Sequence, residues 1–383
     1  MSVPFPRAEF DARMARLKEA MAADRMDAML LFAPESLYWL TGYDSAGYTF
    51  FQCLTVTSSG RMTLLTRAPD LRQARHTSIL DEILVWADRA DADPVKTLKE
   101  QLFEMDLLGA RIGVETDTIG LSAKAGRTLD DQLRSFGTLL EASDVVPRLR
   151  AVKSPAEIAY LREAAALADD AWRAGVATIE PGARESAVRA AIAASILSAG
   201  GELPAPGVTV GSGHDALLVR GRVGDRTLEA NDQVMLNFAG SKARYHATLT
   251  DVVVLGEPRP RHNDMFDAVE AAFCAIVAAM RPGNTFGAVY DAHAQVMRDR
   301  GMGRNRLNAC GASMGAVFAP TWSSPPMFYH GNPAVIVPDM VLFAHAVLLD
   351  SEHDTAMAVG RTFLTHDGEA EPLSSLPVKF VRK

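Results

Sequence analysis

A strong helix-start signal divides this chain into two parts. Ser154 is a candidate N-cap, Pro155 follows at the first helical position, and Glu157 completes a capping box. Apolar residues then recur at helical spacing, which predicts a long amphipathic helix. The chain has 383 residues, which is more than the roughly 100–200 residues of a usual domain. We therefore expect two domains, at residues 1–150 and 151–383.

The first part alternates helical and extended patterns. Helices are predicted at residues 9–23, 93–105 and 122–136, and strands at residues 28–32, 51–56, 61–66 and 111–114. The second and third strands flank a Ser-Ser-Gly turn at Gly60, which is typical of a hairpin. Strands that alternate with helices indicate a compact α/β domain.

The second part contains a faint internal duplication. Pro181-Gly182 and Pro282-Gly283 each precede a helical stretch, at an offset of 101 residues. Strands are predicted most clearly at residues 233–238, 244–255, 341–349 and 355–364. The repeat suggests two related halves around one sheet. We therefore expect an α+β fold in which amphipathic helices back a curved antiparallel sheet.

Composition and charge exclude several classes of protein. Hydrophobic residues make up 48% of the chain and charged residues 22%, as in an ordinary globular protein. The net charge of −8 and the lack of a basic run argue against a nucleic-acid partner. Three isolated cysteines fit neither a disulfide scaffold nor a thiolate zinc site. No signal peptide and no membrane span is predicted, so we expect a cytoplasmic protein.

Several segments, in order, resemble the creatinase and Xaa-Pro aminopeptidase family. They lie at residues 35–43, 150–158, 231–239, 338–341 and 365–368. The resemblance implies an N-terminal creatinase-like α/β domain and a C-terminal pita-bread domain with pseudo-twofold symmetry. It also implies a homodimer in which the N-terminal domain of the neighbour closes the active site.

The peptidase members of that family hold two metal ions with two Asp, one His and two Glu. In this chain those positions fall on Asn237, Thr248, Ala312, His345 and Val359. A dinuclear centre needs oxygen and imidazole ligands with enough charge to offset the cations, and one imidazole does not supply that. We therefore expect no metal ion and no other cofactor.

The metal-free members, creatinase and ectoine hydrolase, cleave C–N bonds in small nitrogenous solutes. Residues 244–249 and 318–322 resemble the ectoine hydrolase group. The match is incomplete, because the catalytic His of creatinase falls on Arg220 and its Glu falls on His345. The chemistry of this chain must therefore be argued from its own residues.

Strand alternation predicts which side chains enter the cavity. We expect His345 and His246 to be catalytic, because two imidazoles can divide general-base and general-acid work near neutral pH. Arg220 suits a substrate carboxylate. Asn237 and Thr248 offer neutral hydrogen bonds to the substrate. Trp322, in a proline-rich aromatic loop, completes the set of substrate-binding candidates.

The leading interpretation is a metal-independent hydrolase of a C–N bond in a small, carboxylate-bearing nitrogenous solute. One alternative is an Xaa-Pro dipeptidase-type metallopeptidase, and another is a non-catalytic protein that binds a small molecule. A histidine in a strand is also commonly structural, and Arg220 could simply pair with Asp215 or Asp225. The expected partners are a small-molecule substrate and a second copy of the chain, without nucleic acid or membrane.

Overall fold

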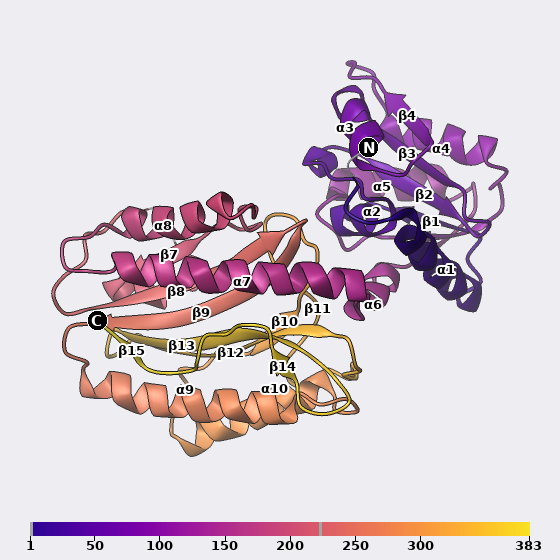
Figure 1. Ribbon diagram of the computed structural model, residues 1–383. Helices are drawn as coiled ribbons and strands as arrows, with labels where there is room; N and C mark the ends of the chain where they lie inside the picture. The colour runs from indigo at the N-terminus through magenta and orange to yellow at the C-terminus, as the bar shows by residue number, and fades with distance from the viewer. Residues whose placement is uncertain (1–2, 222–223) are drawn as a thin grey trace. The chain divides into compact units, whose positions relative to one another are not determined.

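The computed structural model describes residues 3–221 and 224–383. The chain divides into two compact units, Met1–Arg150 and Ala151–Lys383. Figure 1 labels the helices and strands of both units. Among the described residues, no helix combines the length and the apolar character that crossing a membrane requires.

The first unit is built on a six-stranded sheet in the order β4-β3-β2-β1-β5-β6. Its strands are β1 (Ala28–Leu31), β2 (Cys53–Thr57), β3 (Met62–Arg67), β4 (Glu82–Trp86), β5 (Arg111–Val114) and β6 (Thr138–Glu141). Strand β2 pairs antiparallel with β1 and β3, and the other neighbours are parallel. The predicted hairpin and the α/β alternation are both present.

Helices pack on both faces of this sheet. They are α1 (Arg7–Ala23), α2 (Pro34–Thr41), α3 (Leu71–Thr77), α4 (Pro94–Glu104), α5 (Ala123–Leu133) and α6 (Val145–Ala151). On β1, Met29 and Leu31 join one apolar core, whereas Ala28 and Leu30 join the other. This explains why β1 is apolar at every position rather than alternating.

The second unit contains a nine-stranded sheet, with β11-β10-β12-β13-β9-β8-β7 as its main path. The path comprises β7 (Thr209–Ser212), β8 (Asp232–Lys242), β9 (Tyr245–Leu255), β10 (Gly311–Ser313), β11 (Ser324–Met327), β12 (Val341–Asp350) and β13 (Thr355–Leu364). Two short strands, β14 (Glu371–Pro372) and β15 (Val381–Arg382), pair with β13 and β9. The long hairpins β8–β9 and β12–β13 are antiparallel, as the sequence predicts.

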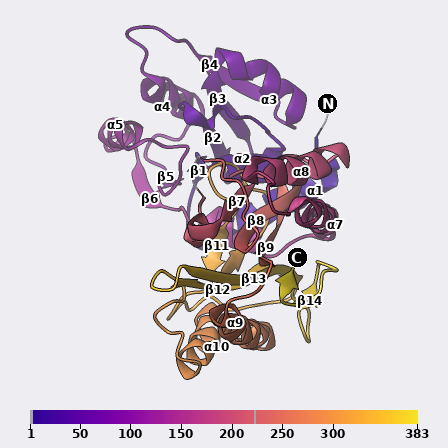
Figure 2. The ribbon, with the colours of Figure 1, turned by 90° about the vertical axis from the view of Figure 1, so that its left-hand side faces the viewer.

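Two helix pairs back this sheet (Figures 1 and 2). The pair α7 (Pro155–Thr178) and α8 (Glu185–Ser198) shares a core with β8 and β9. The pair α9 (Pro260–Ala279) and α10 (Phe286–Asp299) shares a core with β12 and β13. Helices α8 and α10 both have 14 residues and begin 101 positions apart, so the faint duplication corresponds to two equivalent helices.

The predicted capping box starts α7. The Ser154 hydroxyl accepts the Glu157 N–H at 3.2 Å, and the Glu157 carboxylate accepts the Ser154 N–H at 2.9 Å. The same carboxylate also accepts the Tyr245 hydroxyl at 2.8 Å, which ties the start of α7 to β9. The helix-start signal therefore marks the beginning of the second unit's first long helix.

Candidate active site

A cavity of about 620 Å³ lies in the second unit. Strand alternation builds its floor. On β12, Leu342, Ala344 and Ala346 pack into the core that includes α9 and α10. The intervening side chains Phe343, His345 and Val347 line the cavity, and Val347 also contacts that core. The cavity therefore lies on the face of β12 that carries His345, as strand alternation predicts.

The remaining walls come from segments distant in sequence. Loop residues at 205–206, 219–220, 307 and 319–323 contribute, together with the starts of β7 and β10. Four of the six predicted site residues line this cavity, namely Arg220, Asn237, Trp322 and His345. Among the described lining residues, Arg220 carries the only charged side chain, and none is Asp or Glu.

His345 is held by its strand neighbours. It pairs with Gly360 across β12–β13, and a Cβ at Gly360 would lie 3.1 Å from the His345 Cβ. The Phe343 ring lies 5.2 Å from the imidazole, centroid to centroid. Burial lowers the pKa of His345 to about 4, so the ring is neutral at physiological pH. Its Nδ1 is buried and has no hydrogen-bond partner among the described residues.

A second imidazole, which the sequence analysis missed, interacts electrostatically with His345. His293 on α10 is 1% exposed, and neither of its ring nitrogens has a partner among the described residues. Burial, with smaller contributions from His345 and Arg306, lowers the pKa of His293 to about 3. Arg306 also leaves its buried Nε unpartnered. Buried polar atoms without partners are uncommon, so this cluster is an unusual feature of the molecule.

Asn237 and Thr250 form a polar pair on the neighbouring strands β8 and β9. The Thr250 hydroxyl donates to the Asn237 Oδ1 at 2.8 Å, and the Asn237 Nδ2 donates to the Val219 carbonyl at 3.2 Å. These bonds fix the orientation of the amide, and both side chains line the cavity. Thr250 is thus also part of the candidate site.

Arg220 is an exposed side chain at the cavity wall. It forms no ion pair with any residue among 3–221 and 224–383, and Asp225 pairs with Arg184 instead. The guanidinium therefore has its donors available for a bound molecule.

His246 does not line the cavity, contrary to expectation. Its Nε2 accepts the Ala205 N–H at 2.9 Å, and its Nδ1 contacts the Arg244 carbonyl at 2.7 Å. With both nitrogens engaged by backbone, the ring is the neutral tautomer protonated at Nδ1. Burial lowers its pKa to about 4. His246 therefore positions Ala205, which lines the cavity, and has no free nitrogen for catalysis.

Thr248 is also outside the cavity. It is buried, its hydroxyl contacts the Met314 sulfur at 3.8 Å, and its backbone exchanges hydrogen bonds with the Thr362 hydroxyl. The expected face is right, but the cavity extends along β9 only as far as Thr250.

The five family metal positions do not form a ligand set. Asn237, Ala312 and His345 line the cavity, whereas Val359 pairs with Ala346 and belongs to the apolar core. One imidazole and one amide, without a carboxylate, do not fit a dinuclear centre. Elsewhere in the described chain, Asp350, Glu352 and His353 cluster in the β12–β13 turn. Arg261 and His353 already bind the Asp350 carboxylate there, as in an ordinary polar turn.

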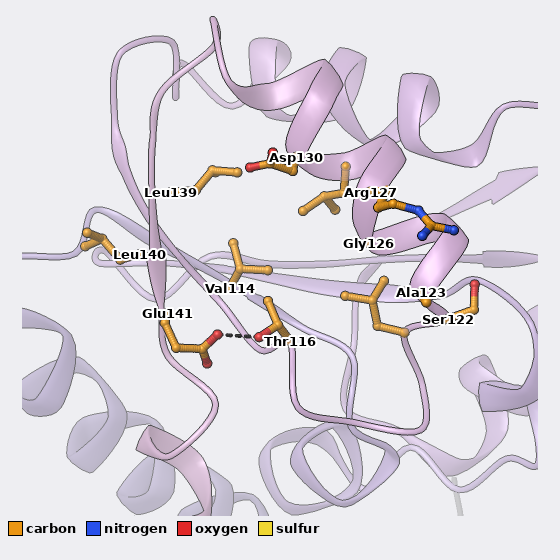
Figure 3. Close-up of a pocket in the computed structure, with 12 residues that line it drawn as sticks. Val114, Thr116, Ser122, Ala123, Gly126, Arg127, Asp130, Leu139, Leu140 and Glu141 are labelled. Atoms are coloured by element: carbon orange, nitrogen blue, oxygen red, sulfur yellow. Dashed lines mark hydrogen bonds between the residues drawn. The ribbon is translucent and has the colours of Figure 1, made fainter.

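Two other cavities are less suited to chemistry. One, of about 300 Å³, lies in the first unit beside α5, where Thr116 donates to Glu141 (Figure 3). The other, of about 540 Å³, lies beside α9, and its two arginines are paired with carboxylates. Neither cavity is lined by a histidine.

Comparison with known proteins identifies relatives over the whole chain. Residues 13–152 match the Creatinase/Prolidase N-terminal domain, and residues 159–363 match Metallopeptidase family M24. An ectoine hydrolase from Halomonas elongata is 25% identical over 393 residues, covering 98% of each chain. An Xaa-Pro dipeptidase from Pyrococcus furiosus is 22% identical over 308 residues, covering 79% of this chain and 82% of its own length.

The solved structures show the same fold. An Xaa-Pro dipeptidase from Bacillus anthracis superposes with a TM-score of 0.84 at 19% identity, over 98% of this chain and 100% of the other. The expected architecture, a creatinase-like α/β domain followed by a pita-bread domain, is thereby confirmed.

Proposed function

This chain belongs to metallopeptidase family M24, and we propose that it is a hydrolase that cleaves a C–N bond without a metal ion. The observation that carries the proposal is the lining of its cavity. By the sequence resemblance, His345 falls on a metal-ligand position of the family, and no described lining residue is Asp or Glu. The substrate we propose is a small, carboxylate-bearing nitrogenous solute.

His345 acts as the general base. With a pKa of about 4, its imidazole is unprotonated throughout the physiological range. It accepts a proton from a water molecule, whose oxygen attacks the carbon of the scissile C–N bond. A low pKa makes the base weak, but keeps it in the required form at neutral pH.

The same imidazole then acts as the general acid. His345 is the one histidine among the described lining residues, so neither His246 nor His293 reaches the substrate for this step. The protonated His345 returns the proton to the leaving nitrogen as the C–N bond breaks. One water is consumed, a C–O and an N–H bond form, and the imidazole ends neutral.

Arg220 binds the substrate carboxylate, because its planar guanidinium can donate two parallel N–H hydrogen bonds to one carboxylate. Asn237, held by Thr250 and Val219, offers its remaining N–H to the polarised carbonyl or amidine group. The Trp322 ring supplies an apolar wall for the body of the solute.

A hydrolysis assay tests this function. Chelator-treated protein is incubated with N-acyl amino acids, creatine, ectoine and Xaa-Pro dipeptides, and products are identified by mass spectrometry. His345→Gln serves as the control, since it keeps most of the volume. We expect turnover of at least one solute by the wild type and loss of it in the variant. Turnover that appears only after adding Mn²⁺ or Co²⁺ would support the metallopeptidase alternative, and binding without turnover would support the non-catalytic one.

A further inference from the structure

The described residues that line the cavity carry a positive charge but no negative charge. Arg220 supplies a positive charge, and the other described lining residues are neutral at pH 7, with His345 included because of its lowered pKa. Threonines at 209, 250 and 321, with Ser323 and Asn237, provide hydrogen bonds but no negative charge. Such a lining suits an anion.

Among the described lining residues, a cationic group on a bound molecule would find no carboxylate to pair with. Burying an ammonium or amidinium group is costly unless an opposite charge and hydrogen bonds compensate for the lost hydration. The Trp322 and Phe343 rings of the lining can attract a cation, but cation–π attraction does not replace a carboxylate. The Arg220 guanidinium would in addition repel the cation.

We propose that the natural substrate is an N-acyl or N-carbamoyl amino acid, an anion whose scissile nitrogen is neutral and which carries no ammonium or amidinium group. This inference rests on the proposed function for the identity of the active site, and deepens it by naming the substrate class. It predicts discrimination against free dipeptides, which carry an ammonium group beside the scissile amide. It also predicts discrimination against cyclic amidinium zwitterions.

A matched trio of ligands tests the charge requirement. N-propionylproline and glycylproline have nearly the same shape and differ in a methyl group against an ammonium group. N-propionylpyrrolidine keeps the amide but lacks the carboxylate. Dissociation constants are measured by titration calorimetry at pH 7 with chelator-treated protein. We expect N-propionylproline to bind about tenfold or more tightly than either of the others. Glycylproline carries an ammonium group that the cavity does not match, and N-propionylpyrrolidine lacks the carboxylate that Arg220 binds.

Two variants check that the lining causes the preference. Arg220→Gln should bring the affinity for N-propionylproline down to that for N-propionylpyrrolidine. Asn237→Asp is nearly isosteric, can still accept the Thr250 hydroxyl, and places a carboxylate in the cavity. The Asn237→Asp variant should narrow or reverse the preference for N-propionylproline over glycylproline. Equal or tighter binding of glycylproline by the wild type, or no binding of any member of the trio, would overturn the inference.

Failure of this inference is distinguishable from failure of the proposed function. Selective binding of N-propionylproline without hydrolysis would disprove the hydrolase and leave the charge selection standing. Metal-free hydrolysis of glycylproline in preference to N-propionylproline would disprove the charge selection and leave the proposed hydrolase function standing. Circular dichroism of each variant shows that a lost affinity does not reflect a lost fold.

Discussion

His345 lies on β12 with its imidazole at the cavity, beside Phe343 and opposite Gly360. Its lowered pKa gives a specific kinetic signature. Below pH 4 the protonated ring cannot act as a base, so kcat/KM should rise with pH through an apparent pKa near 4. Above about pH 5 the rate should be flat through neutrality. A pH–rate profile with an acid limb near pH 6.5 would contradict the assigned environment of the ring.

His246 differs from His345, because both of its ring nitrogens are engaged by backbone groups. His246→Leu leaves the Ala205 N–H without the acceptor it has in the wild type. It also removes the contact to the Arg244 carbonyl, which still accepts the Val317 N–H at 3.0 Å. We expect it to lower the free energy of unfolding by about 1–3 kcal/mol, as for other lost buried hydrogen bonds. Denaturant unfolding measures this. If stability were unchanged while kcat fell a hundredfold or more, His246 would be catalytic after all.

At the scale of the elements, the register of β12 and β13 creates the space that His345 and Phe343 occupy. A Cβ at Gly360 would lie 2.8 Å from two ring carbons of Phe343. Gly360→Ala should therefore displace that ring into the cavity, cost about 1–3 kcal/mol of stability, and weaken ligand binding. Gly368→Ala is the matched control, because nothing lies within 4 Å of the added carbon. Equal stability and equal ligand affinity of the two variants would contradict this expectation, because the added carbon at Gly360 would then not displace the Phe343 ring.

In the second unit, the long strands could be predicted from the sequence, whereas its shortest strands could not. Strands β12 and β13 have ten residues each, enough for a clear extended pattern. Strand β10 has three residues, yet it brings Gly311 and Ala312 to the cavity. Three residues establish no period, so their place depends on tertiary pairing with β12.

The residues of the candidate site could be predicted only in part from the sequence. Alternation identifies the face of a strand but not where along it a cavity ends, and this is why His246 and Thr248 were wrongly placed in the cavity. His293 was missed because it belongs to no motif. It does lie on the apolar face of α10 with Tyr290, Ala294 and Met297, all of them buried. An imidazole at helical spacing among apolar residues is the signal that could have found it.

At the scale of the whole molecule, buried histidines make stability depend on pH. Burial lowers the pKa values of His246, His293 and His345 below the unfolded value of 6.5. The unfolded state therefore binds more protons between pH 6.5 and pH 4, and stability is lost as the pH falls through this range. His293→Leu should reduce that pH dependence by about 1.4 kcal/mol per pH unit, the linkage of one proton.

The same variant should also be more stable at pH 7, because it removes a buried imidazole without partners. His330→Ala is the control, since His330 is exposed. Unfolding curves at several pH values measure both effects. A steeper pH dependence in His293→Leu than in the wild type would contradict the placement of His293.

The homodimer expected from the family resemblance stays a prediction.

We propose that this member of metallopeptidase family M24 hydrolyses its substrate without a metal ion, through His345. The most direct test is a two-by-two turnover measurement on a solute identified by the hydrolysis assay. Wild type and His345→Gln are each assayed after exhaustive chelation and again after adding Mn²⁺, with bound metal quantified by mass spectrometry. We predict equal wild-type rates with and without Mn²⁺, and a loss of about 10²–10⁴-fold in His345→Gln under both conditions. Wild-type turnover that requires stoichiometric metal, or that His345→Gln retains, would contradict the account.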